Sequence, residues 1–331
     1  MEKKMWVYFL QLSTNIWGDA RMTPLTIPYN SEIYAPFHEE MLTEDAVWRE
    51  VIDYLPARGF NTVLIDVADG MQYDSHPEIS IRGAWSKEKL KRELEYMRSI
   101  GLTPIPKLNF STTHDVWLKI YSRMVSTPTY YQVCEDLIKE VAEVFDYPAL
   151  FHLGLNADLI KPVRLMNRVR QGDQWWEDAF FFFGVCEKLG MRPWVWANPC
   201  WYKREEYYER MPKSVLQSNW AYHPYGFTRN PDRSFKDYKI QACVELDKHG
   251  FEQIPLSGVT GRWPDPVENL VGCWRNTKMV MELYQEFVAP ERLLGHMVGV
   301  WDNLTTEAKY AFWNEAECMY SSRKTVLPDW E

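Results

Sequence analysis

The chain of 331 residues has a formal net charge of −9, with 46% apolar and 25% charged residues. The acidic balance argues against a nucleic-acid-binding protein, which needs a basic stripe, because the longest basic cluster, 87–91, contains Glu88. No stretch approaches the roughly 20 apolar residues that span a bilayer, so we expect no membrane partner. The composition is typical of a folded globular chain and excludes disordered and disulfide-stapled classes.

Aromatic residues are the main departure from ordinary composition. They make up 15% of the chain and include 16 Trp. Sugar-binding enzymes use flat aromatic faces to stack on pyranose rings, although cores and protein interfaces use aromatic residues as well. The enrichment is therefore consistent with a carbohydrate ligand without specifying one.

Two features predict a cytoplasmic protein. The six cysteines lie far apart without a C-x-x-C pair, and most fall in helix-like apolar patterns that favour buried, reduced thiols. The N-terminal apolar run is short, is interrupted by Gln11 and is followed by no cleavage site of small residues. We therefore expect residues 6–12 to form the first strand rather than a secretion signal.

Short apolar runs alternate with amphipathic stretches along the chain. The predicted strands are 6–12, 61–67, 102–110, 150–155, 192–198, 214–220, 251–257 and 293–301. The predicted helices are 44–58, 86–100, 128–145, 172–190, 203–211, 234–249, 266–288 and 304–320. Eight such pairs predict an α/β fold, a single-domain (β/α)8 TIM barrel over residues 1–331.

Capping signals support the helix boundaries. Ser86 is placed to cap the helix that follows it, and Gly101, Gly190 and Gly250 stand where left-handed C-caps belong. The connections from helix to strand are consequently short. The connections from strand to helix are long and polar: 68–85, 111–127 and 221–233. In a barrel these loops share the rim that carries active sites.

The C-terminal ends of the predicted strands carry acids, amides, one lysine and several tryptophans. These residues are Asp66, Asp69, Lys107, Asn109, His152, Asn156, Asp158, Trp196, Asn198, Trp220, Trp301 and Asp302. Amides and acids bond hydroxyl groups, while indole rings provide an apolar platform. We therefore expect a pocket for a small carbohydrate ligand.

Each of these residues also has a structural interpretation. Asp66 can bond backbone amides at a strand end, and Asp69 belongs to an Asp-Gly pair that is common in plain turns. His152, within an apolar strand, is more often a hydrogen-bonded core histidine. Lys107 must either face the lumen or find an acid partner, because an unpaired buried charge is costly. The tryptophans can simply fill the core.

Motifs for other chemistries are missing from the sequence. It contains no H-x-x-x-H, H-E-x-x-H, Walker A or G-x-G-x-x-G pattern, and its seven His are scattered. A G-x-S-x-G elbow is also absent. We therefore expect neither a metal nor another cofactor, and no Ser/His/Asp triad.

Three segments carry a resemblance to a known family. The run from Gly59 to Asp115, "FHLGLNAD" and "GVWDN" follow the motif order of the catalytic barrel of family 20 glycoside hydrolases. The chain resembles this β-N-acetylhexosaminidase group, and especially its shorter barrel-only relatives, over residues 59–301. "FHLGLNAD" matches the family's His-x-Gly-Gly-Asp-Glu signature through His152 and Gly154. The resemblance also adds His114, at the end of the third-strand motif, to the substrate-binding candidates.

The resemblance implies a catalytic pair that this chain lacks. In the family, the Glu of the pair protonates the leaving oxygen, and the Asp orients the 2-acetamido group of the substrate. Asn156 stands at the Asp position and Ala157 at the Glu position. A methyl group cannot donate a proton, and general acid catalysis is typically worth about 10²- to 10⁴-fold. Hydrolysis should be very slow unless another acid serves.

Other family acids are replaced as well. The family's Pro-Glu-x-Asp is Pro106-Lys107-Leu108-Asn109 here, and Asn198 stands where relatives often have an acid. Amides in place of acids preserve hydrogen-bonding shape while removing charge.

Three explanations of the altered catalytic pair remain open. Asp158 can act as a relocated acid with Asp69 or Asp302 as its partner; the chain can be an inactive sugar-binding protein; or Asn156 and Ala157 can be deliberate replacements of an Asp-Glu pair. A non-hydrolytic sugar enzyme with Lys107 or His152 as base is a further class. We expect a glycoside hydrolase-like protein that acts on or binds a small glycoside or oligosaccharide. The oligomeric state is left open.

Overall fold

The computed structural model describes residues 4–18, 37–159, 168–222, 230, 235–258 and 266–327. The described chain contains eight parallel strands. They are β1 (Met5–Gln11), β2 (Thr62–Asp66), β3 (Thr103–Lys107), β4 (Leu150–His152), β5 (Arg192–Trp196), β6 (Leu216–Ser218), β7 (Leu256–Ser257) and β8 (Gly295–Gly299). Their order in the sheet is β6-β5-β4-β3-β2-β1-β8-β7.

The two ends of this sheet meet, so the barrel is nearly closed. Parallel bridges join Gln217 to Gln253 and Trp220 to Leu256, across the gap between β6 and β7. The backbone N–H of Leu256 donates to the carbonyl of Asn219 at 3.0 Å. The architecture is that of a (β/α)8 barrel, which confirms the predicted fold class.

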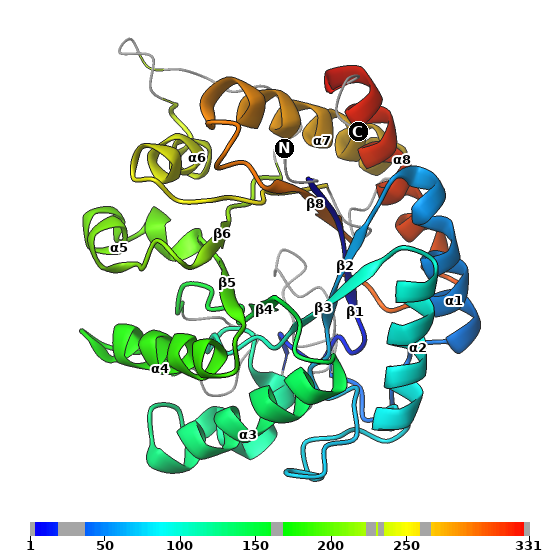
Figure 1. The fold of residues 1–331 in the computed structure, drawn as a ribbon, viewed down its shortest axis with the longest axis vertical. Helices are drawn as coiled ribbons and strands as arrows, with labels where there is room; N and C mark the ends of the chain where they lie inside the picture. The colour runs from blue at the N-terminus through cyan, green and yellow to red at the C-terminus, as the bar shows by residue number, and fades with distance from the viewer. Residues whose placement is uncertain are drawn as a thin grey trace.

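The helices alternate with the strands and surround them (Figure 1). They are α1 (Asp45–Tyr54), α2 (Lys87–Ser99), α3 (Pro128–Val144), α4 (Gln174–Lys188), α5 (Arg204–Arg210), α6 (Tyr238–Lys248), α7 (Pro266–Phe287) and α8 (Lys309–Val326). Short 3-10 helices interrupt the loops: η2 (Pro56–Arg58), η3 (Val116–Arg123) and η4 (Asn198–Trp201).

The predicted helix caps are present. The Ser86 hydroxyl accepts a hydrogen bond from the backbone N–H of Lys89 at 3.2 Å. Gly101, Gly190 and Gly250 have φ values of 88°, 77° and 78°, in the left-handed region. The six cysteines are free and buried, as expected.

Several predicted element boundaries are wrong. The third strand ends at Lys107 rather than at residue 110, the seventh covers only Leu256–Ser257, and the last helix begins at Lys309 rather than at residue 304. Apolar composition reports burial and not ladder pairing: Phe110 is fully buried although it lies beyond the end of β3. The predicted loop 221–233 lies outside the described residues apart from 221, 222 and 230.

The barrel interior is apolar along most of its length and becomes polar at the C-terminal ends of β1 to β4. The apolar part is formed by side chains from most of the strands: Val7, Phe9, Leu64, Ile105, Trp194, Leu216 and Met297. The ladder register then aligns Gln11 with Asp66, Asp66 with Lys107, and Lys107 with His152. Paired residues in a parallel ladder point to the same face, so these four face the lumen together.

Among the helices of the described residues, none has the length and apolar character required to cross a membrane.

Candidate functional site

A buried ion pair joins the neighbouring strands β2 and β3 at their C-terminal ends. Lys107 Nζ donates to Asp66 Oδ2, and neither side chain is exposed. Burial raises the pKa of Asp66 and lowers the pKa of Lys107, and the charge of each partner opposes these shifts. The Lys107 ammonium also lies 5.4 Å from the ring centroid of Phe9. Lys107 therefore has the acid partner that a buried lysine requires.

His152 lies beside this pair as a neutral, fixed imidazole. Its Nδ1 accepts a hydrogen bond from the backbone N–H of Gly154 at 3.0 Å, and its ring centroid is 4.4 Å from that of Trp196. Burial, and secondarily the charge of Lys107, holds the pKa of His152 well below its usual range. His152 Nε2, Asp66 Oδ1 and the side-chain amide of Gln11 make no hydrogen bond within the described residues. These polar groups in the lumen can therefore each make a further hydrogen bond.

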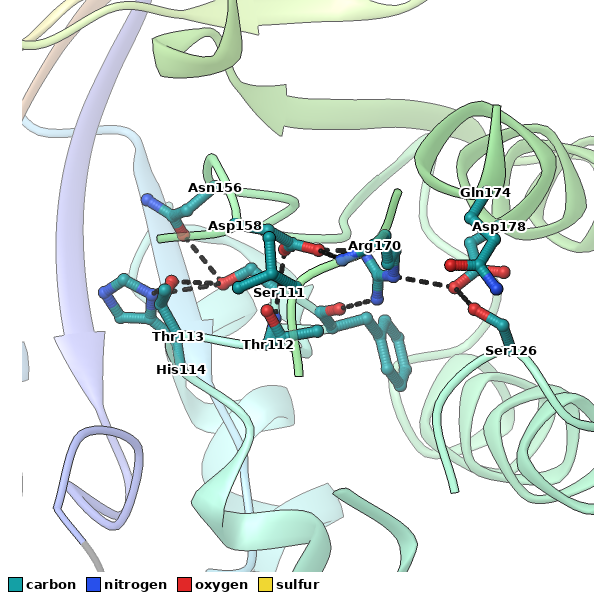
Figure 2. Close-up of polar contacts among 12 residues, drawn as sticks. Ser111, Thr112, Thr113, His114, Ser126, Asn156, Asp158, Arg170, Gln174 and Asp178 are labelled. Atoms are coloured by element: carbon teal, nitrogen blue, oxygen red, sulfur yellow. Dashed lines mark hydrogen bonds and ion pairs between the residues drawn. The ribbon is translucent and has the colours of Figure 1, made fainter. Parts of the chain in front are cut away.

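An amide pair lies above the ends of β3 and β4. Asn109 Nδ2 donates to Asn156 Oδ1 at 3.1 Å, and the Ser111 hydroxyl lies 3.5 Å from the same oxygen. Ser111 Oγ is also 3.1 Å from His114 Nδ1 (Figure 2). The side-chain carbonyl of Asn156 is therefore held by its neighbours, and its NH₂ group remains as a donor for a ligand.

The backbone after β4 makes this amide pair possible. Gly154 and Leu155 have φ values of +70° and +55°. A Cβ on Gly154 would lie 2.0 Å from Asn109 Oδ1, so only glycine fits there. Leu155 occupies the left-handed region without being glycine, at a cost of roughly 1–2 kcal/mol. Backbone strain of this kind is concentrated at functional sites.

Ala157 and Asp158 follow the amide pair and differ in their surroundings. Ala157 is 8% exposed and offers no polar atom. Asp158 Oδ1 accepts from the Thr112 N–H at 3.4 Å, Asp158 Oδ2 accepts from the Arg170 N–H at 3.1 Å, and Arg170 Nη1 lies 3.7 Å from Oδ1 (Figure 2). Both carboxylate oxygens already have donors, which hold the Asp158 side chain toward Thr112 and Arg170.

Arg170 itself is fixed by a wider buried network. Its Nη2 donates to the Phe110 carbonyl at 2.8 Å, and its Nε lies 2.7 Å from Asp178 Oδ2. The Ser126 hydroxyl donates to the same Asp178 oxygen at 2.9 Å. Arg170 was not a candidate from the sequence, where nothing marks it as the partner of an acid twelve residues earlier.

An aromatic cluster lines the same end of the barrel. The ring of Trp301 lies 4.6 Å from Phe9, 5.9 Å from Trp17 and 6.1 Å from Trp196, between centroids. Trp17 also contacts the ring of His114 at 6.2 Å. Trp17 was missed from the sequence, although its place directly after the first strand puts it on the rim where the other candidates lie.

Asp69 belongs to a separate buried contact between the β1 and β2 loops. Its carboxylate accepts from the Ser13 hydroxyl at 2.5 Å and from Asn15 Nδ2 at 3.0 Å. Burial raises the pKa of Asp69 to about 6, against the lowering effect of these two hydrogen bonds. Ser13 and Asn15 were not predicted from the sequence, although they too follow the first strand.

The raised pKa of Asp69 predicts a pH-dependent stability. The folded state binds this proton more tightly than the unfolded chain, whose carboxyl has a pKa near 3.8, so Asp69 lowers stability as the pH rises from about 4 to about 6. In Asp69→Asn this contribution disappears. We expect the free energy of unfolding of the variant, relative to wild type, to increase by up to about 3 kcal/mol between pH 4 and pH 7. Urea titrations across this range measure it, and a constant difference would contradict the assignment.

The remaining candidates lie around the same rim. Asn198 begins η4, is buried, and its Oδ1 has no hydrogen bond within the described residues. Asp302 Oδ1 accepts from the Asn303 N–H at 2.8 Å. Trp220, after β6, packs against Trp201 at 4.5 Å between ring centroids. The structure thus brings Lys107, His152 and Trp196 together in the lumen, whereas Asp69 and Asp158 belong to separate contacts.

No group of three or more His, Cys, Asp or Glu within the described ranges is arranged to hold a metal ion.

The fold is a (β/α)8 barrel whose C-terminal rim carries the acids, amides and tryptophans described above. No protein-family model and no curated protein matches the chain. Among solved structures, similar folds include the pneumococcal virulence factor StrH (TM-score 0.65, 14% identity, 98% of this chain and 84% of the other). A β-N-acetylhexosaminidase from Bacteroides fragilis is also similar (TM-score 0.62, 12% identity, 95% and 66%).

A third similar structure is the family 20 exo-β-N-acetylglucosaminidase from Vibrio harveyi, solved with N-acetylglucosamine (TM-score 0.60, 13% identity, 98% of this chain and 57% of the other). The chain therefore spans less than two thirds of the length of two of these three structures. The expected resemblance to the family 20 barrel is confirmed for the fold.

Proposed function

We propose that this chain binds a small neutral carbohydrate containing an N-acetylhexosamine at the C-terminal mouth of its barrel, with little or no hydrolysis. The observation that carries the proposal is the hydrogen bond of 3.1 Å between the side-chain amides of Asn109 and Asn156. These amides are followed by Ala157, which stands where the family resemblance implies a proton-donating Glu. The amides can bond sugar hydroxyl and acetamido groups, but neither amide nor methyl group supplies a proton.

The character of the mouth favours a sugar over other small ligands. Trp196 and Trp301 supply aromatic faces, and the charge of Lys107 in the lumen is neutralised by Asp66. His152 Nε2, Asp66 Oδ1 and the Gln11 amide retain the capacity to bond hydroxyl groups. Apolar walls with a few polar groups are typical of a pocket for a neutral polyhydroxylated molecule.

One similar structure supports the binding of a sugar after the loss of an acid. A Streptomyces plicatus β-hexosaminidase carrying an Asp-to-Ala substitution was solved in complex with its product, N-acetylglucosamine. A barrel of this type can therefore hold a sugar after loss of an acid. In the present chain, Asp158 is held by Arg170 and loop amides, which weakens the alternative that it acts as a relocated acid.

The test combines binding with restored catalysis. We expect N-acetylglucosamine to raise the melting temperature of the wild type, and aryl N-acetylglucosaminides to be turned over barely or not at all. In Asn156→Asp/Ala157→Glu the rate should rise by about 10²- to 10⁴-fold, because a general acid is restored. Asn156→Asp alone is the matched control and should gain little, since it leaves the methyl group at 157.

Two results would contradict the proposal. If no N-acetylhexosamine shifts the melting temperature or binds by calorimetry, the binding function is wrong. If the wild type hydrolyses aryl glycosides at an ordinary rate and Asp158→Asn abolishes this activity, Asp158 is a relocated acid and the protein is a hydrolase.

A further inference from the structure

A hollow lies on the outer side of the rim, between η4, the start of α5 and the start of α6. Its volume is about 610 Å³, and it is lined by Trp201, Tyr202 and Tyr238 together with the charged run 203–206. η4 packs against both α5 and α6, which are neighbours on the barrel wall (Figure 1). None of these lining residues belongs to the site in the barrel mouth.

The aromatic side of this hollow is buried at its base and exposed at its edge. Trp201 is 7% exposed, and its Nε1 donates to Asn219 Oδ1 at 2.9 Å. Tyr202 and Tyr238 are 53% and 41% exposed, and their ring centroids lie 6.3 Å and 5.9 Å from that of Trp201. Exposed aromatic groups gathered in a hollow are typical of a binding surface.

The charged side of the hollow is balanced. Lys203 and Arg204 are offset by Glu205 and Glu206, and Lys203 Nζ lies 3.6 Å from Glu206 Oε2. A site for a phosphate or an acidic peptide needs an excess of positive charge. The run 203–206 carries no net charge and offers several donors and acceptors, which suits hydroxyl groups, while the tyrosine rings suit the apolar faces of sugars.

Trp220 lies between the hollow and the apolar cluster of the barrel lumen, against which it packs. Trp220 contacts Trp201, with 4.5 Å between ring centroids. Trp220 lies two residues after Ser218, the ladder partner of Trp196, and therefore points to the same side of the sheet about 6–7 Å further along it. Trp196 and Trp301 then line the mouth itself.

We propose that this outer hollow binds further sugar units of an oligosaccharide whose end unit occupies the barrel mouth. The proposal rests on the proposed function, because the outer units extend the same ligand. The ligand class follows from the balanced charges of the run 203–206, the exposed tyrosines, and Trp220, which contacts Trp201 and packs against the lumen cluster that contains Trp196.

The experiment compares short and long ligands. The probes are N-acetylglucosamine and its β-1,4-linked dimer, trimer and pentamer, with a panel of other N-acetylhexosamine-terminated glycans. We expect the wild type to bind at least one longer glycan about tenfold or more tightly than the monosaccharide. In Tyr202→Ala/Tyr238→Ala this gain should fall about tenfold, because two aromatic contacts are lost, while monosaccharide affinity is unchanged.

The matched control is Tyr147→Ala/Tyr310→Ala, which removes two tyrosines that are 53% and 69% exposed elsewhere. It should retain the gain. If the wild type binds no sugar of any length, the proposed function fails and this inference fails with it. If the wild type binds short and long glycans equally, or if the Tyr202/Tyr238 variant keeps the gain, this inference alone is overturned and sugar binding at the mouth stands.

Discussion

Replacing Lys107 by Met is expected to lower the free energy of unfolding by about 3–5 kcal/mol, because it leaves Asp66 as an unpaired charge in the barrel lumen. Neither side chain of the pair is exposed. Within the described residues, Asp66 Oδ1 has no hydrogen bond and Asp66 Oδ2 accepts from Lys107. Urea unfolding monitored by tryptophan fluorescence measures the change.

The double variant Asp66→Leu/Lys107→Met separates the charge effect from loss of packing. Replacing both members of a buried ion pair by apolar groups of similar volume is often neutral or stabilising. We therefore expect the double variant to recover most of the loss. A single variant that loses less than about 1 kcal/mol would show that Asp66 is readily neutralised or hydrated in the lumen.

The fold was predictable because its signals are local. Eight apolar runs alternate with amphipathic stretches, and residues such as Ser86 and Gly101 mark the helix ends. Strand ends were less predictable, since Phe110 stays buried after leaving the ladder of β3. Burial alone therefore extends a predicted strand into the loop that follows it.

The site was predictable only where strand ends determine it. Lys107 and His152 face the lumen together because the ladder pairs them directly. The partners of Asp69 and Asp158 were missed, because Ser13, Asn15 and Arg170 come from other loops. No spacing rule in a sequence predicts which loop residue meets which acid across a rim.

Gly154 is the position where the backbone most directly determines the geometry of the candidate site. The substitution Gly154→Ala is expected to cause the second large loss of stability. Its φ is +70°, and an added Cβ would lie 2.0 Å from Asn109 Oδ1 and 2.8 Å from Asn109 Cα. Because the second contact is with backbone, moving the Asn109 side chain cannot relieve it. We expect a loss of about 2–4 kcal/mol, from a left-handed alanine plus overpacking.

Gly190→Ala is the matched control for this variant. Gly190 has a φ of +77°, and an added Cβ meets nothing within 4 Å, so the variant pays only the backbone cost of about 1 kcal/mol. The difference between the two variants in urea unfolding isolates the clash at Asn109. Gly154→Ala should also displace Asn109 from Asn156, so sugar binding should be lost under conditions where the variant is still folded. Equal losses of stability in the two variants, with sugar binding intact in both, would show that the turn after β4 relaxes freely and does not hold the amide pair in place.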